Sequence, residues 1–365
     1  MVETVTLLGC EDVGPIHGPA GHYGALARDT LLAADIRFAQ VERVYSERGG
    51  LQPHSGGGHS RLPPAMASVF SDCGFNIVSV ASNHAMDRGG EALLDTIDLL
   101  RGQGIQTIGA GRNLTEARRA AFIDCNGLRV AFLAYCSILH DGYAAGADKP
   151  GVAPLRAYTR YEPVDDQPGV PPRIVTTPDG QDLAALLADV RSAKEAADKI
   201  VLSLHWGIHF VPRLIAEYQK TVADAAFAAG ADVILGHHAH VPKAIEVHAG
   251  KTCFYSLSNF IMSAPAKTDE AAAEFCARYG VILDPDYPHL PYGTDSKRSL
   301  VAKAVISKEG IRTSFLPALI DTRLRPEILH AGDPRFDDMV RYMEWASEGF
   351  AHRFTIADDE VVITT

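Results

Sequence analysis

The sequence predicts an α/β fold in which a mostly parallel sheet carries its functional residues at one edge. Short apolar runs that suit buried strands alternate with helical patterns through most of the chain. Four of these runs, beginning at Val5, Ile77, Ile200 and Val233, are followed at once by residues that can bind a metal. Because ligands of such sheets bind outside the carboxyl ends of the strands, these residues should meet in one crevice.

A helix should follow the run that begins at Ile77. Leu93, Ile97 and Leu100 recur at helical spacing, and Gly102 should end that helix. Further along, Asn126-Gly127 joins two strand-like runs, at 121–124 and 130–135. This dipeptide between two strands predicts a β-hairpin.

Two stretches, about 139–180 and 263–298, interrupt the alternation because they are rich in Pro, Gly and Asp and show little periodicity. We interpret both as irregular insertions at the functional edge, and the first as a candidate lid. Regular elements are expected around them: helices at 181–197 and 214–229, and strands at 253–257, 300–307 and 311–316. Residues 1–325 should form one domain, followed by a C-terminal tail, 326–365, with one amphipathic helix at 336–346.

Composition limits the possible partners. The chain of 365 residues is 47% hydrophobic and 22% charged, which is ordinary for a soluble globular protein, and its formal net charge is -11. That charge argues against nucleic acid and anionic membranes, since both are polyanions. An anionic small-molecule substrate stays possible if a metal supplies local positive charge. The oligomeric state is not predicted.

Localisation is expected to be cytoplasmic. No run reaches the ~18 to 20 apolar residues that span a bilayer, and the N-terminus has no signal-peptide pattern. The six cysteines are scattered, without a paired motif, which suits a reducing compartment. Cys10 is the one cysteine beside candidate ligands, and core packing at a strand end accounts for it.

Histidines dominate the candidate ligands. Gly236-His237-His238-Ala239-His240 follows one strand, and His205 follows another. A glycine entry followed by a kinked turn can aim both His238 and His240 toward the same site. Whether His237 joins His238 and His240 stays open at this point.

The pair Asn83 and His84 supplies an amide oxygen and a possible acid. Asp87 either orients His84 by accepting its ring N–H or caps the following helix. Carboxylates follow two more strands: Glu11 or Asp12 after the first, and Glu42 after the run 34–38. Carboxylate, amide and imidazole in one crevice suit Zn, Mn or Fe.

These motifs resemble the CapA family of capsule and poly-γ-glutamate synthesis proteins, a bacterial branch of the calcineurin-like metallophosphatase superfamily. The resemblance runs from about residue 4 to 262. The matching segments are Ser82–Gly89, Leu204–Gly207, Gly230–Val241, Tyr255–Phe260 and, more loosely, Ala34–Glu42. Several motifs in the family's order make the resemblance specific.

The resemblance implies a four-layer α/β/β/α sandwich with one or two divalent ions at the strand ends. Carried over by position, the implied metal ligands are Asp12, Glu42, Asn83, His205, His238 and His240. His84, with Asp87, stands at the family's acid position. Arg88 and Asn259 are weaker candidates for binding substrate.

The chain departs from the family pattern around its first ligand. The family's Gly-Asp becomes Gly9-Cys10-Glu11-Asp12, so either acid could serve, and the sequence that follows favours Asp12. Gly14 stands where many superfamily members have a histidine, which puts the second metal in doubt.

We therefore expect a soluble metal-dependent hydrolase that uses an activated water on a small, anionic substrate, either a phosphoester or an amide. The alternatives are a metal-dependent lyase, decarboxylase or isomerase acting on a small carboxylate, an accessory protein of capsule or poly-γ-glutamate synthesis, and a binding module that keeps a metal for structure. Fold does not fix chemistry, so the sequence leaves the substrate, the metal and the number of ions open.

Overall fold

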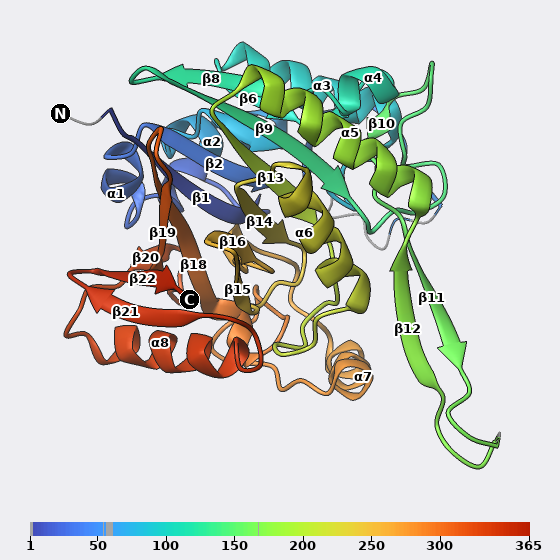
Figure 1. The fold of residues 1–365 in the computed structure, drawn as a ribbon. Helices are drawn as coiled ribbons and strands as arrows, with labels where there is room; N and C mark the ends of the chain where they lie inside the picture. Colours follow the sequence, from blue (N-terminus) through green and yellow to red (C-terminus); the bar gives the residue numbers. More distant parts are fainter. Residues whose placement is uncertain (1–2, 54, 56–60, 167) are drawn as a thin grey trace.

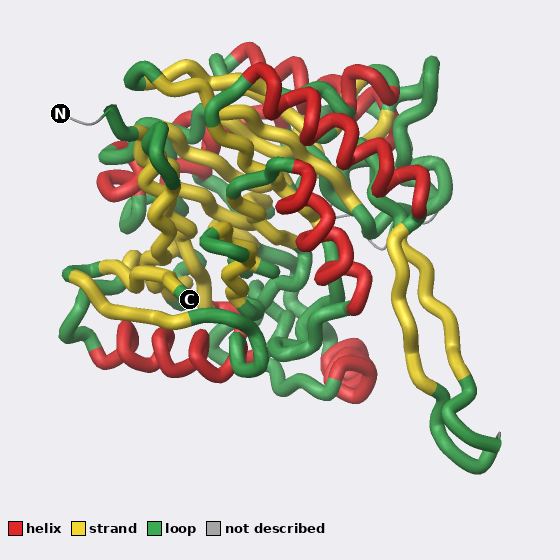
Figure 2. The backbone as a smooth tube through the Cα atoms, viewed as in Figure 1, coloured by secondary structure: helices red, strands yellow, loops and turns green. Residues whose placement is uncertain are grey.

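The computed structural model describes residues 3–53, 55, 61–166 and 168–365. Two β-sheets pack face to face, and helices cover their outer faces, so that the layers run helix, sheet, sheet, helix (Figures 1 and 2). The predicted α/β class and four-layer α/β/β/α sandwich are confirmed. Among the described residues, no helix combines the length and apolar character needed to cross a bilayer.

The first sheet holds ten strands in the described part of the chain. Its main path runs β21 (Arg353–Ala357), β22 (Glu360–Thr364), β19 (Ile311–Ile320), β18 (Arg298–Ile306), β1 (Val5–Gly14), β2 (Ile36–Val41), β5 (Ile77–Ser79) and β6 (Gln106–Ile108). Off this path, β17 (Asn259–Met262) pairs with β1, and β20 (Pro326–Ile328) pairs with β19. Helices α1 (Arg28–Leu32), α2 (Ser68–Asp72) and α3 (Gly89–Gly102) belong to the layer on its outer face.

The second sheet runs β15 (Ile245–His248), β16 (Lys251–Phe254), β14 (Val233–His237), β13 (Lys199–His205), β9 (Leu128–Cys136) and β8 (Ala121–Cys125). Helices α5 (Gly180–Ala196) and α6 (Glu217–Ala229) cover its outer face (Figure 1). The predicted hairpin joins β8 to β9, and Asn126 and Gly127 have φ values of 49° and 73°. Both residue types tolerate this left-handed backbone in a tight turn. Shorter elements are β3 (Val44–Tyr45), β4 (Arg61–Leu62), β7 (Ala110–Gly111) and α4 (Leu114–Ala117).

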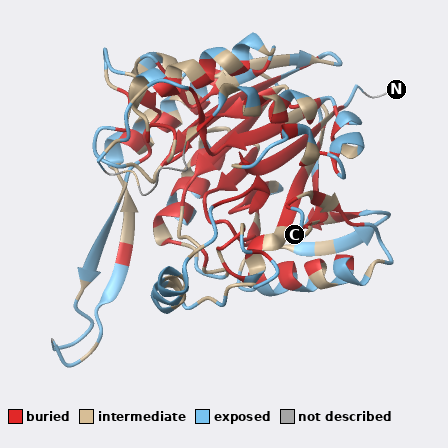
Figure 3. Ribbon diagram, turned by 180° about the vertical axis from the view of Figure 1, so that it is seen from behind, coloured by how far each residue is buried: buried red, intermediate tan, exposed pale blue. Residues whose placement is uncertain are grey.

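Close contact between the two sheets forms the centre of the core, where the strands are buried (Figure 3). Phe38 of β2 stacks on Phe132 of β9, with ring centroids 6.3 Å apart. A Cβ atom at Gly9 would lie 2.9 Å from Leu235 Cδ1, so a larger residue there would require the Leu235 side chain to shift. The glycine lets β1 approach β14 just before its carboxyl end.

Strand register brings the ends of both sheets to one edge. In the first sheet, β1 runs parallel to β2 and β17, and Asp12 aligns with Gln40 and Asn259. In the second, β13 runs parallel to β14, and His205 aligns with His237. Parallel strands end together, so residues far apart in sequence meet where the chain leaves each strand.

The prediction of irregular structure for the two insertions is partly wrong. Residues 139–180 contain β10 (Gly151–Val152) and a hairpin of β11 (Ala157–Glu162) and β12 (Arg173–Pro178) that projects from the body of the molecule (Figure 1). Residues 263–298 contain α7 (Asp269–Tyr279). Both elements are largely exposed (Figure 3), so they lack the apolar periodicity on which the prediction relied.

The C-terminal tail contains the expected helix, α8 (Pro334–Ala346), which begins after its N-cap Asp333. It also contains β20, β21 and β22, which the sequence analysis did not expect. These strands extend the first sheet through β19, so the tail continues the main core. The division at residue 325 stays a prediction about domain organisation.

Candidate metal centre

Three buried side chains from three strand ends form a candidate metal site. Asp12 lies in β1, Glu42 directly follows β2, and His205 ends β13. One possible ligand atom of each lies within 4.8 Å of the corresponding atoms of the other two. All three residues are at most 1% exposed. The two sheets thus contribute carboxylates from one side and imidazole from the other.

Two further candidates lie beside His205. The Asn83 Oδ1 atom is 2.7 Å from His205 Nε2, and His238 Nδ1 is 3.2 Å from the same atom. Glu42 Oε2 is 3.8 Å from it. Ligands bonded at 2.0–2.2 Å to one ion lie about 3.0 to 3.4 Å apart in octahedral or tetrahedral geometry. These spacings therefore suit a shared divalent ion with little movement of side chains.

His240 lies on the Asp12 side of the group. Its Nδ1 atom is 3.2 Å from Asp12 Oδ2 and 2.7 Å from Asn259 Oδ1. The Asn259 amide nitrogen donates to the carbonyls of His240 and Ser296, so its Oδ1 accepts from the His240 ring. This contact places the proton on Nδ1 and leaves Nε2 unprotonated. The structure thus places Asn259 as a residue that orients His240.

The backbone bends at the histidine motif in the way that its glycine allows. His238 and His240 have φ values of 94° and 56°, and both side chains lie at the site. His237 points elsewhere: its Nε2 atom is 3.0 Å from Ser203 Oγ, and its ring stacks on Phe38 between the sheets. This placement answers the open question about His237, which belongs to the core.

Glu11 and Asp12 have different partners. Both oxygens of Glu11 accept hydrogen bonds from Ser256 Oγ, at 3.0 and 3.2 Å. Asp12 carries two buried oxygens that accept no hydrogen bond, although Oδ2 lies near His240. The register of β1 against β2 shifts between Gly9 and Asp12, which marks an irregularity at the two acids. Asp12 is therefore the acid placed to bind a metal.

His84 lies at the outer side of the group and is held by Asp87. Its Nδ1 atom is 2.7 Å from Asp87 Oδ2, and its Nε2 atom is 3.9 Å from Glu42 Oε1. The side chain is 24% exposed, so one part of the ring reaches solvent. Tyr143 donates to Asp87 Oδ1 at 3.0 Å, and Ser82 donates to Glu42 at 2.7 Å. These two hydroxyls fix the carboxylates on either side of His84.

Arg88 follows Asp87 and is the N-cap residue of α3. It is half-buried, and its role in binding substrate stays a prediction.

Electrostatics at the site favour a bound cation. Burial raises the pKa of Asp12 well above its usual value, and the nearby Glu42 carboxylate raises it further. Burial, followed by neighbouring imidazoles, lowers the pKa of His205 and His238, so both imidazoles are neutral at pH 7, the form that can bind a metal. Glu42 Oε1 and both Asp12 oxygens are buried without a hydrogen-bond partner. Unpaired buried acceptors are costly, and a divalent ion would satisfy all three. The residues present therefore fit a metal.

Three further residues at this site were not predicted from the sequence. Arg43 is buried directly after Glu42 and was not considered. His209, four residues after His205, packs on the His238 ring at a centroid distance of 3.7 Å. Tyr292, from the second insertion, stacks on the His240 ring at 4.5 Å. The charge at a strand end was a signal for Arg43, whereas nothing local places Tyr292.

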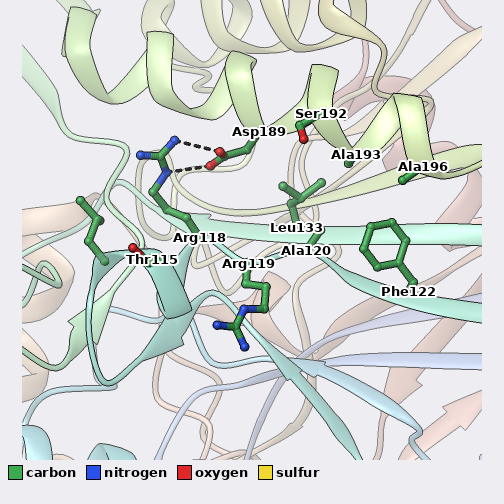
Figure 4. Close-up of a pocket in the computed structure, with 11 residues that line it drawn as sticks. Thr115, Arg118, Arg119, Ala120, Phe122, Leu133, Asp189, Ser192, Ala193 and Ala196 are labelled. Atoms are coloured by element: carbon green, nitrogen blue, oxygen red, sulfur yellow. Dashed lines mark hydrogen bonds and ion pairs between the residues drawn. The ribbon is translucent and has the colours of Figure 1, made fainter. Parts of the chain in front are cut away.

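A hollow of about 510 Å³ lies elsewhere, between β8, β9, α4 and α5 (Figure 4). Arg118 there forms a two-pronged ion pair with Asp189. None of the predicted site residues lines this hollow. We therefore do not connect it with the metal chemistry.

The two-sheet sandwich and the buried cluster at its strand ends define an α/β/β/α protein with a candidate centre for a divalent metal. The family model described as "Bacterial capsule synthesis protein PGA_cap" matches residues 20–264. The chain belongs to this family, and the predicted resemblance is confirmed.

Two curated relatives are similar to the chain. The PGA biosynthesis protein CapA of Bacillus subtilis (strain 168) is 31% identical over 206 residues, which are 56% of this chain and 47% of that protein. The capsule biosynthesis protein CapA of Bacillus anthracis is 31% identical over 211 residues, 56% of this chain and 44% of that protein. The chain thus matches somewhat less than half the length of these relatives.

Comparison with solved structures matches the chain to the calcineurin-like phosphoesterase YfkN from Bacillus subtilis. It shares 13% identity and a TM-score of 0.37 over 95% of this chain and 100% of that one.

Metal binding should stabilise the folded chain measurably. Zn²⁺ or Mn²⁺ added to chelator-treated protein should raise the melting temperature, because an ion that binds only the folded state adds about 2.7 kcal/mol at 100 times its Kd. Differential scanning fluorimetry across metal concentrations gives the measurement. If Zn²⁺, Mn²⁺ and Fe²⁺ all leave the melting temperature of the chelated protein unchanged, the site does not bind metal.

Proposed function

We propose that the chain is a metal-dependent hydrolase that cleaves a small anionic phosphoester or amide with water. The observation that carries this proposal is the meeting of Asp12, Glu42 and His205 at the strand ends, with buried carboxylate oxygens that lack partners. Asn83, His238 and His240 complete the set of residues that would hold the ion.

A bound divalent ion supplies an activated water, by lowering its pKa toward about 7, and polarises the substrate oxygen. The protein's own acid would be His84. Asp87 holds its Nδ1–H, so the protonated ring can give the proton on Nε2 to the leaving oxygen or nitrogen. Tyr143 keeps Asp87 in place by a hydrogen bond to its other oxygen. The partial exposure of His84 supports a position between the metal ligands and an incoming substrate.

A hollow of about 310 Å³ beside α7 supports an anionic substrate with an apolar part. His209, which packs on His238, forms one wall, and Phe210 and Phe275 add aromatic surface. Lys267 lies over the Phe275 ring at 4.4 Å and brings a cation to the hollow. We propose this hollow as the place where the substrate group remote from the reaction binds.

Lys267→Ala should raise KM roughly 5- to 10-fold with little change in kcat, because a partly exposed cation that binds an anion contributes about 1 kcal/mol. Steady-state kinetics on a charged substrate and its neutral analogue measures this. Lys220→Ala is a matched control, since Lys220 also lies over an aromatic ring, Phe350, but not at the hollow. Equal losses in both variants, or equal losses on both substrates, would remove Lys267 from the site.

A second candidate function is an accessory role in capsule or poly-γ-glutamate synthesis. The family match and the names of the two Bacillus relatives favour it. Purification of the tagged chain from a capsule-forming bacterium should then recover polymer-synthesis proteins. Recovery that persists in a variant lacking the metal ligands would separate this role from hydrolysis.

A direct test of the hydrolase proposal is turnover on a panel of phosphomonoesters, phosphodiesters and γ-glutamyl or N-acyl amides. The protein would be chelated and then reloaded with Zn²⁺, Mn²⁺ or Fe²⁺. We expect hydrolysis of at least one class that disappears on chelation and returns on reloading. A metal-loaded protein that converts small carboxylates without adding water would instead support the lyase or isomerase alternative.

A further inference from the structure

Arg43 is a buried cation with unused hydrogen-bonding capacity. It follows Glu42 directly and is only 2% exposed. Its Nη2 atom donates to the Ser263 carbonyl at 3.3 Å, while Nε and Nη1 have no hydrogen-bond partner. A guanidinium is costly to bury unless negative charge lies nearby. The charge that acts on it comes from the metal centre, because Arg43 interacts electrostatically with both Asp12 and Glu42.

The Arg43 side chain also occupies the space next to Gly14. A Cβ atom at Gly14 would lie 2.6 Å from Arg43 Cγ and 3.3 Å from its Nε. Gly14 stands two residues after Asp12 at the end of β1, where neighbouring side chains alternate between faces of the sheet. Any ligand side chain at position 14 would therefore collide with Arg43. The absence of a side chain at Gly14 therefore leaves the space that the Arg43 side chain occupies.

The candidate ligands divide unevenly around this cation. Glu42, Asn83, His205 and His238 lie together at contacts of 2.7 to 3.8 Å around His205 Nε2. On the other side, the neighbour of Asp12 is His240. The Arg43 side chain fills the space that a ligand side chain at position 14 would need. Asp12 and Glu42 carry two negative charges, which one divalent ion neutralises. The Arg43 guanidinium adds a further positive charge beside these two carboxylates, where it can attract an anionic substrate.

We infer that the centre holds one divalent ion per chain and that the Arg43 guanidinium takes the place of a second, as a fixed positive charge beside Asp12. This inference rests on the proposed metal centre. It concerns the number of ions and the source of the remaining positive charge, and it assigns a function to a residue that the hydrolase proposal does not use.

The number of metal ions bound per chain tests this inference directly. Chelated protein would be reloaded with Zn²⁺, passed through gel filtration and measured by plasma mass spectrometry. We expect one ion per chain in the unaltered protein and two in the double variant Arg43→Gly with Gly14→His, which exchanges the cation for a ligand. Two ions in the unaltered protein would overturn the inference and leave the hydrolase proposal standing. No bound ion would overturn both.

A single substitution keeps the test valid if the double variant does not fold. Arg43→Gln should bind Zn²⁺ about tenfold more tightly in competition with a chelator, because a cation that repels the ion has been removed. A purely structural arginine would give the opposite sign, since its loss would loosen the ligands. Arg118→Gln, which breaks an ion pair far from the site, should leave Zn²⁺ affinity unchanged. Weaker or unchanged Zn²⁺ binding by Arg43→Gln would overturn the inference.

Discussion

Glu42→Gln should lose the metal and nearly all turnover. The substitution keeps the shape of the side chain and an oxygen that can accept from Ser82, but it removes the charge that lies between Asp12 and His205. We expect metal affinity to fall at least about 100-fold, since even residues outside the ligand set change it by up to that factor. Turnover should fall about 10³-fold, equivalent to about 4 kcal/mol of lost transition-state stabilisation.

The measurements for this variant are metal content after gel filtration and kcat/KM on the substrate class found in the panel. The metal-free variant should be no less stable than the metal-free parent, because burial raises the pKa of the Glu42 carboxyl and disfavours its charge. Glu246→Gln is the matched control. The Glu246 carboxylate, on β15, accepts a hydrogen bond from the Tyr255 hydroxyl and lies outside the ligand set. Full metal content and turnover in Glu42→Gln would refute the site.

His84→Gln should separate proton transfer from metal binding. A general acid typically contributes about 10²- to 10⁴-fold, so kcat should fall within that range while metal content stays unchanged. Glutamine cannot donate an acidic proton but fills similar space. Asp87→Asn should cause a smaller loss, because it removes the residue that holds the ring and leaves the ring itself.

The dependence of activity on the leaving group tests the role of His84 as the acid more specifically. A substrate that releases nitrophenolate needs little protonation, so His84→Gln should lose much less activity on it than on an alkyl ester or amide. His330→Gln serves as a control, since His330 is exposed and paired with Asp359. Equal losses on both kinds of substrate, or loss of the metal, would show that His84 is not the acid.

Much of the fold could be predicted because the spacing of apolar residues in the sequence reflects the face that each helix or strand buries. The strands of both sheets and the long helices α3, α5 and α6 follow alternation and helical spacing, which reflect the faces they bury. The Asn126-Gly127 turn was readable because few residues adopt its backbone conformation. The four-layer arrangement itself came from the family resemblance, since periodicity alone does not say how two sheets pack.

The elements that escaped prediction bury little apolar surface. Helix α7 has no buried residue, although its N-cap Thr268 and its alanine-rich sequence were local signals for a helix. The hairpin of β11 and β12 exposes most of its side chains, so neither face shows alternation. Among the three tail strands, β22 pairs with β19 at long range, and such pairing leaves no mark in a short window of sequence. Strand β20 forms a local hairpin with β19, and β21 forms one with β22.

At the site, sequence spacing indicated which side chains lie at strand ends, and the structure brings those candidates together. The spacing did not indicate the direction in which each side chain points. His237 faces the core while His238 faces the site, and the difference depends on a positive φ that the motif permits without requiring. Arg43 could not be placed either, because its packing beside Gly14 and its nearness to Asp12 depend on the tertiary structure.

The most direct test of the metal centre is a crystal structure of the chain grown with Zn²⁺, with anomalous diffraction recorded at the zinc edge. We predict one strong peak at ligand distance, about 2.0 to 2.2 Å, from Glu42, His205 and His238, with Asn83 and Asp12 turned toward it. A zinc ion bound elsewhere, with these side chains paired among themselves as in a closed core, would contradict the account.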